Sequence, residues 1–401
     1  MLVGNPESRT RRPVPTALLR TPWYLCMPLQ PSRFPTPVLF AAIPIPFAVF
    51  LWGQLPGFEP EEALSPGSPP AYGELAPEDN PFEALPLELA REAPMPLPGS
   101  ASTPEVRPHP YSEEVRASFR IRVRDAVVPY RVLGVTVRPG ETVDIELDEI
   151  WGEGAAEGFL LRTPDGVETP YSPGRWTWTA PQTPGEAVPL RVESPVDMDA
   201  ITLNVLILHP FEAVENGELN GFRIGTYRST PDLPPPPGFV EASPELLDLR
   251  VSPGFTLRQY LPRQEGNPRY LVLSEHLTLK MEAILEEVRV EGIEAATLYV
   301  MSGFRTPWYN RAIGNTTDHS RHLWGDAADF FIDETGNGWM DDLTGNGEGG
   351  EADARLLYRI VERVQDRAEP HVVQGGLSSY RANAVRGPFI HVDTRGARAR
   401  W

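Results

Sequence analysis

The spacing of hydrophobic and polar residues changes along the chain and predicts two kinds of folded region. From about Ala117 apolar and polar residues alternate, as in "SFRIRVRDAVVPYRVLGVTVRPGETVDIELDE". The runs "GRWTWTAPQTPGEAVPLRVES" and "DAITLNVLILH" continue this period of two, and Gly/Pro turns separate them. Short alternating runs of this kind predict antiparallel strands, so residues 116–230 are expected to form an immunoglobulin-like β-sandwich. Trp176 and Trp178 alternate in one run, and one of them is expected to face the core.

A helical spacing begins after a second Pro-rich segment, "STPDLPPPPGFVEASPE". Ser274 is a plausible N-cap and Gly292 a plausible end of this helix. Its apolar positions are Leu277, Leu279, Met281, Ile284, Leu285 and Val288. A buried strand ("AATLYVMSGF"), a second amphipathic helix ("EADARLLYRIVERVQDRA") and a final strand ("GPFIHVDT") follow. This order predicts an α+β domain over residues 240–401.

An uncharged apolar run, residues 34–58, lies near the N-terminus. Five arginines precede it within residues 1–33 and three glutamates follow it, which is the positive-inside arrangement. We expect residues 34–55 to be a signal anchor that crosses the membrane, with a basic cytoplasmic segment at residues 1–33. The alternative is a cleaved signal peptide, with translation starting at Met27. Either reading places the remainder in the periplasm or elsewhere outside the membrane.

Residues 56–115 carry twelve acidic side chains, two basic ones and fourteen prolines, a composition typical of an extended linker. The formal net charge of the whole chain is -19, so we expect no nucleic acid partner. The single cysteine, Cys26, excludes both a disulfide framework and a zinc site built on several cysteines.

Histidines and a carboxylate in the α+β region offer a metal site. His322 lies in a polar turn, whereas Asp329 and His391 lie in the apolar runs "AADFFI" and "PFIHVD". Burying a bare carboxylate is costly unless a cation or donors compensate it. Taken alone, such a histidine and aspartate also fit an ordinary hydrogen-bonded pair.

Three motifs, in this order along the chain, favour the metal site over the hydrogen-bonded pair. They are "SGFRTPWYN" (302–310), "SRHLWGDAADFF" (320–331) and "GPFIHVDT" (387–394). In these motifs the chain resembles the zinc-dependent D-Ala-D-Ala carboxypeptidases and murein endopeptidases of the LAS-type fold. The resemblance covers about residues 240–401 and leaves the preceding residues unexplained.

The resemblance implies a zinc ion held by His322, Asp329 and His391. It also implies that Arg305 binds a substrate carboxylate and that Ser320 hydrogen-bonds substrate; a structural ion pair is the alternative for Arg305. Zinc would lower the pKa of a bound water and polarise the scissile carbonyl. Several members of the family carry Glu or Asp three residues before the last histidine, where this chain has Pro388.

The identity of the general base is therefore open. Asp393 is the favoured candidate, although it could instead orient His391. His371 is a weaker candidate for the same role.

The segment "DETGNGWMDDLTGNGEGGEADA" (333–354) contains "TGNG" twice, each time two residues after an aspartate. The pattern is close to the start of an EF-hand loop, but no glutamate stands at its twelfth position. A calcium site and a solvated acidic loop both remain open. The candidate calcium ligands are Asp333, Asn337, Asp342 and Asn346.

These observations predict a membrane-tethered zinc peptidase acting on peptidoglycan, as a D,D-carboxypeptidase or as a murein endopeptidase. A zinc-containing wall-binding module without turnover and a purely structural envelope protein are the alternatives.

Overall fold

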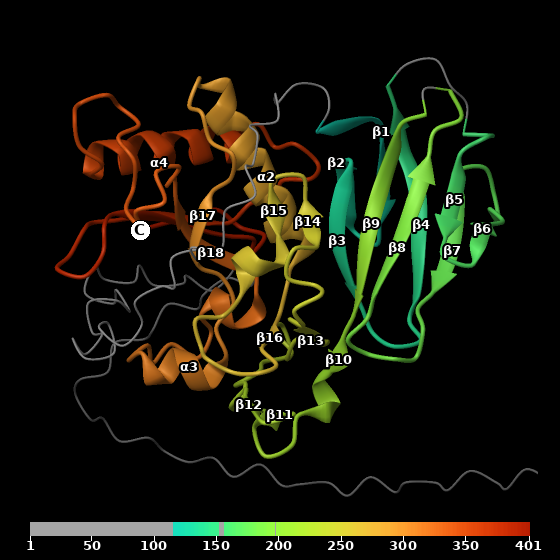
Figure 1. Cartoon of the computed structure of the whole chain (residues 1–401), viewed down its shortest axis with the longest axis horizontal. Coiled ribbons are helices and arrows are strands. Elements are labelled where there is room, and N and C mark those ends of the chain that lie inside the picture. The colour runs from blue at the N-terminus through green and yellow to red at the C-terminus, as the bar shows by residue number, and fades with distance from the viewer. Residues whose placement is uncertain (1–114, 152–155, 197) are drawn as a thin grey trace, which may run out of the picture. The chain divides into compact units, whose positions relative to one another are not determined.

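The computed structural model describes residues 115–151, 156–196 and 198–401. Over these residues the protein is a mixed α+β structure with more strands than helices (Figure 1). The predicted membrane segment and the acidic linker lie outside the described residues. Within the described part of the chain, no helix is long and apolar enough to cross a membrane.

Two sheets form the region that follows residue 115. A four-stranded sheet has the order β2-β1-β4-β7, and a five-stranded sheet has the order β3-β9-β8-β5-β6. Neighbouring strands are antiparallel except for the parallel pair β3–β9. The strands are β1 (Arg116–Val123), β2 (Ala126–Tyr130), β3 (Val132–Val137), β4 (Thr142–Ile150), β5 (Leu160–Thr163), β6 (Gly166–Glu168), β7 (Arg175–Thr179), β8 (Ala187–Glu193) and β9 (Ala200–Ile207).

The predicted alternation produces one hydrophobic core between these sheets, with Phe119, Trp176 and Leu203 among its members. The sequence predicts that one of Trp176 and Trp178 faces the core, and in the structure both are buried. Residues two apart in a strand project to the same face, so both indoles reach the core. The immunoglobulin-like topology stays a prediction.

Short elements connect this region to the C-terminal sheet. A three-stranded sheet has the order β10-β13-β16, and its middle strand comes from the second Pro-rich segment. The connecting strands are β10 (His209–Pro210), β11 (Glu218–Leu219), β12 (Phe222–Arg223), β13 (Gly238–Glu241), β14 (Arg250–Ser252), β15 (Phe255–Thr256) and β16 (Tyr270–Leu271). Two 3₁₀ turns accompany them, η2 (Phe211–Ala213) and η3 (Leu257–Tyr260).

The C-terminal sheet has the order β17-β18-β20-β19-β21. Its strands are antiparallel except that β21 runs parallel to β19. They are β17 (Tyr299–Ser302), β18 (Ala327–Phe331), β19 (Gly376–Tyr380), β20 (Phe389–Asp393) and β21 (Ala399–Arg400). The helical elements are α2 (Glu275–Val290), α3 (Pro307–Ala312), η4 (Arg321–Trp324) and α4 (Glu351–Asp366).

Helix α4 packs on one face of this sheet through apolar side chains such as Leu357, Leu377 and Val392, and α2 packs against α4. The opposite face carries the polar residues discussed below. The predicted start of α2 is confirmed, because the Ser274 hydroxyl accepts a hydrogen bond from the Leu277 N–H at 3.3 Å.

Helix α2 belongs to both hydrophobic cores. Most of its apolar residues belong to the hydrophobic core that includes the C-terminal sheet, whereas Leu279 joins the core of the two-sheet region, β1 to β9. Two hydrogen bonds strengthen the packing of α2 against the two-sheet region. The Tyr130 hydroxyl donates to Glu286 at 2.8 Å, and the Thr136 N–H donates to Glu275 at 2.7 Å. The packing of α2 therefore depends on the two-sheet region.

Candidate metal centre

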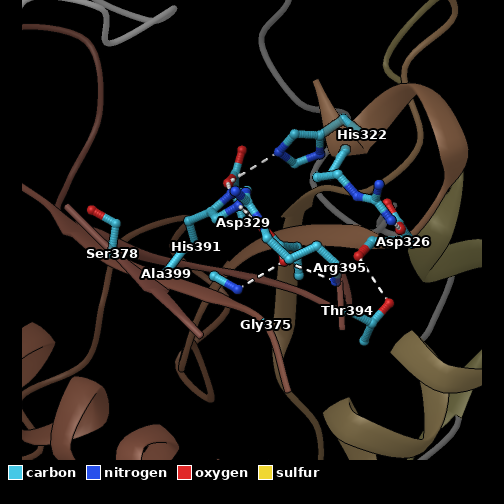
Figure 2. Close-up of polar contacts among 12 residues, drawn as sticks. His322, Asp326, Asp329, Gly375, Ser378, His391, Thr394, Arg395 and Ala399 are labelled. Atoms are coloured by element: carbon cyan, nitrogen blue, oxygen red, sulfur yellow. Dashed lines mark hydrogen bonds and ion pairs between the residues drawn. The ribbon is translucent and has the colours of Figure 1, made fainter. Parts of the chain in front are cut away.

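Strand pairing brings together the aspartate and the second histidine of the predicted triad. Asp329 on β18 lies directly opposite His391 on β20, so both side chains project from the same face of the sheet. His322 comes from the η4 turn, which immediately precedes β18. Figure 2 shows the three side chains converging. All three are buried, with exposed fractions of 7% or less.

A close backbone approach lets η4 lead into β18. Gly325 ends η4 with φ +65°, a left-handed conformation that glycine adopts easily. A Cβ atom at this position would lie 2.2 Å from the carbonyl oxygen of Val272. Glycine is therefore required here for the turn to pass over Val272 and deliver His322 to the site.

The ring of His322 is oriented by a backbone carbonyl. Its Nδ1 lies 2.7 Å from the Gly303 oxygen, which can only accept a hydrogen bond, so Nδ1 carries the proton. Nε2 is then left with a lone pair, and it lies 3.4 Å from Asp329 Oδ1. Burial and the nearby Arg305 guanidinium lower the pKa of His322, which favours the neutral ring that a metal requires.

The ring of His391 lies between two carboxylates. Its Nδ1 is 2.8 Å from Asp329 Oδ1, and its Nε2 is 3.6 Å from Asp393 Oδ2. Burial lowers the pKa of His391, but the two carboxylates outweigh this effect and raise the pKa to about 9. Because Nε2 faces Asp393, Nδ1 is directed towards Asp329 and His322.

These residues fit a zinc ion. Each offers one ligand atom, and the three atoms lie within 4.8 Å of one another. Two imidazole nitrogens and one carboxylate oxygen are donors that zinc prefers, and three protein ligands are typical of a catalytic site. Oriented outer nitrogens are typical of metal-binding histidines. Over the described ranges this is the one such cluster of at least three histidine, cysteine or acidic side chains.

Arg305 does not face solvent in this structure. It is 2% exposed, and its Nη2 donates to Asp329 Oδ2 at 2.6 Å while its Nε donates to Ser302 at 2.8 Å. These contacts favour the structural ion pair over binding of a substrate carboxylate. Burial raises the pKa of Asp329, but the histidines and Arg305 outweigh it and hold the pKa well below its usual range.

Ser320 is half-buried and immediately precedes η4. Its carbonyl oxygen accepts the Leu323 N–H at 2.9 Å, which helps to shape the turn that carries His322. Its predicted hydrogen bond to substrate stays a prediction.

Asp393 is poorly placed to act as the general base. It is fully buried, it accepts the Gly376 N–H at 2.8 Å, and it pairs with Arg395 at 2.9 Å. Burial raises its pKa, but His391 and Arg395 outweigh this and hold the pKa far below its usual range. A carboxylate held this strongly in its ionised form is a weak proton acceptor. The geometry supports the other role considered from the sequence, which is to orient His391.

Buried Lys280 on α2 supports the same segment. Its Nζ donates to the Asp393 carbonyl oxygen at 2.7 Å. The helix that packs into both cores therefore contacts the strand residue that orients His391.

His371 lies away from the metal centre, against the two-sheet region. Its Nε2 is 3.3 Å from the Tyr130 hydroxyl, and burial lowers its pKa to about 4. These contacts give no support to a role for His371 as the general base.

The acidic loop forms two turns of the same design. Asp333 accepts the N–H groups of Asn337 and Gly338, and Asp342 accepts those of Asn346 and Gly347. The loop contributes nothing to the metal-capable cluster found in the described part of the chain. The structure thus gives no support to calcium binding by this loop, and the calcium site stays a prediction.

Sequence reasoning missed two residues beside His391. The ring of Trp401 lies 5.4 Å from the His391 ring, and its Nε1 donates to the Tyr380 hydroxyl at 2.9 Å. Neither residue belongs to the three motifs. No periodicity or spacing in the sequence could have placed β21 beside β19.

Asp393→Asn separates the two roles of Asp393. We expect zinc affinity to fall about 10- to 100-fold, because His391 loses its orienting carboxylate. Chelator competition measures this affinity, and Asp248→Asn, at an exposed carboxylate, is the control. If excess zinc restores any lost activity, the orienting role holds. Unchanged zinc affinity with a persistent loss of turnover would instead identify Asp393 as the base.

A family model described as Peptidase M15 matches residues 260–343. This stretch includes Arg305, Ser320, His322 and Asp329 and ends before His391. The match supports a zinc peptidase of the M15 family, in agreement with the resemblance seen in the motifs. No curated protein and no solved structure matches the chain.

Proposed function

We propose that this protein is a zinc-dependent peptidase that hydrolyses peptide bonds in peptidoglycan stem peptides or cross-links. The observation that carries the proposal is the convergence of His322, Asp329 and His391, with both rings oriented by groups outside the site. The M15 family implies zinc peptidase activity on peptidoglycan-related substrates. The bond that is cut, either the terminal D-Ala or a cross-link, is the finer part of the proposal.

Three residues would hold the metal ion, and three others orient them. His322, Asp329 and His391 would hold the zinc ion, which when bound supplies a Lewis acid and an activated water. Gly303 and Asp393 hold the two rings so that Nε2 of His322 and Nδ1 of His391 point towards Asp329. Arg305 keeps Asp329 ionised and turns its Oδ1 towards both rings.

A second function has one specific observation in its favour. Pro388 replaces the carboxylate that several members of the family carry, and Asp393 is locked to Arg395. A protein without a general base would bind zinc and peptidoglycan peptides but turn over slowly. The alternative is therefore a non-catalytic zinc-containing module that binds the cell wall.

The proposed setting follows from the composition of the chain. We propose that residues 34–55 anchor the protein in the inner membrane and that the acidic, Pro-rich residues 56–115 extend from it. The folded part would then act in the periplasm or outside the membrane, with peptidoglycan as partner and without nucleic acid.

Digestion of purified sacculi by the full chain tests the proposal. We expect the wild type to release peptides and His322→Ala to release none, because the variant lacks one of three zinc ligands. His319→Ala is the matched control, because His319 is an exposed histidine three residues earlier. Mass spectrometry of the products distinguishes loss of terminal D-Ala from cleavage of a cross-link. Stoichiometric zinc and sacculus binding without release of any product would favour the binding module.

A further inference from the structure

Tyr380 and Trp401 lie on the face of the sheet that carries the metal centre. Ser378 pairs with His391 across β19 and β20, and Tyr380 pairs with Phe389. Directly opposed residues project to the same face, and so do residues two apart in a strand. Tyr380 therefore shares its face with His391, opposite the helices.

Three contacts fix Trp401 beside His391. Its carbonyl oxygen accepts a hydrogen bond from Ser378 Oγ at 2.7 Å, and its Nε1 donates to the Tyr380 hydroxyl at 2.9 Å. The guanidinium of Arg395 lies 5.2 Å from the centre of its indole. Trp401 is nevertheless 37% exposed. An aromatic ring that is anchored and still reachable from solvent suits contact with a ligand.

Tyr380 is held in place in a way that leaves its own proton for another group. Its ring stacks on Phe389 with centroids 4.7 Å apart and an interplanar angle of 12°. Because the indole N–H donates to the phenol oxygen, the O–H proton must point elsewhere. Burial raises the pKa of Tyr380, so the hydroxyl keeps this proton at neutral pH.

We propose that Tyr380 donates a hydrogen bond to the carbonyl oxygen of the scissile peptide bond, while Trp401 packs against the peptide and orients the Tyr380 hydroxyl. This inference rests on the proposed peptidase function. It deepens that function, because a donor aimed at the developing oxyanion stabilises the transition state more than the ground state. Arg305 is buried against Asp329, so it is less suited to this task.

The test uses the full chain and two soluble probes, a stem pentapeptide ending in D-Ala-D-Ala and a cross-linked dimer muropeptide. Tyr380→Phe is expected to lower kcat about 100-fold while KM stays within about twofold. Trp401→Ala is expected to raise KM about tenfold and to lower kcat, because the Tyr380 hydroxyl loses the indole N–H that orients it. Trp401→Phe should restore most of the loss in KM but not the loss in kcat, because a phenyl ring has no N–H. Zinc affinity, measured by chelator competition, should be unchanged in Tyr380→Phe. Tyr358→Phe, on α4 behind the sheet, is the matched control.

Three results would overturn the inference. If Tyr380→Phe turns over both probes as fast as wild type, the hydroxyl has no catalytic role. If zinc affinity falls in parallel with kcat, Tyr380 acts only on the structure of the metal centre. If the wild type cleaves neither probe nor sacculi, the proposed function fails, and the role of Tyr380 fails with it. The first two results leave the proposed function standing.

Discussion

Asp329→Ala is expected to abolish zinc binding and to destabilise the folded protein by about 3–5 kcal/mol. One carboxylate serves three partners here, because Oδ1 faces His322 and His391 and Oδ2 accepts from Arg305. Its removal deprives the metal of a ligand and leaves the buried guanidinium without its carboxylate partner. Breaking a buried ion pair in this way costs more than the pair itself contributes.

Zinc content by elemental analysis and urea unfolding by circular dichroism measure the two effects separately. Asp329→Asn should lose zinc with a smaller loss of stability, because the amide keeps the shape and can still accept from Arg305. Asp366→Ala, at an exposed carboxylate of α4, is the control and should retain both properties. One zinc per chain and an unchanged unfolding midpoint in Asp329→Ala would refute the central role of this carboxylate.

A fragment of residues 235–401 is expected to lose cooperative unfolding and stoichiometric zinc, although it contains every proposed ligand. Removing the two-sheet region exposes Leu279 and leaves Glu275 and Glu286 without their partners Thr136 and Tyr130. Helix α2 would then be loosened. Since Lys280 of α2 contacts Asp393, the orientation of His391 should suffer as well.

Single substitutions in the full chain test whether this loss of stability arises where α2 contacts the two-sheet region. Leu279→Ala should cost about 2–5 kcal/mol, the range for truncating a buried leucine. Val290→Ala, at a position of α2 that is 73% exposed, should cost less than about 0.5 kcal/mol. Urea unfolding of both variants and of the fragment gives the comparison. A fragment that unfolds at the midpoint of the full chain would show that α2 does not need the two-sheet region.

The local pattern of the sequence was sufficient for the main elements and for the three residues that the structure brings together. The capped helix at Ser274 and the strand around His391 lie where hydrophobic spacing and capping chemistry predict them. His322 and Asp329 are seven residues apart in one motif, so a turn followed by a strand already brings them close. For Trp176 and Trp178 the same local reasoning predicts one buried indole, whereas the structure buries both.

The roles of the surrounding residues depended on contacts between distant segments. The guanidinium of Arg305 pairs with Asp329, which favours the structural ion pair. The Gly376 N–H and Arg395 both contact Asp393, which favours its orienting role.

Short-range spacing in the sequence thus accounts for the main helices and strands and for the two histidines and the aspartate that converge. The tertiary structure was needed to show which nitrogen of each histidine faces Asp329, that Asp393 contacts both Arg395 and Gly376, and that Trp401 lies beside His391. Those outcomes depend on which strands pair, and on burial and hydrogen bonds across many residues of separation. No local pattern in the chain encodes them.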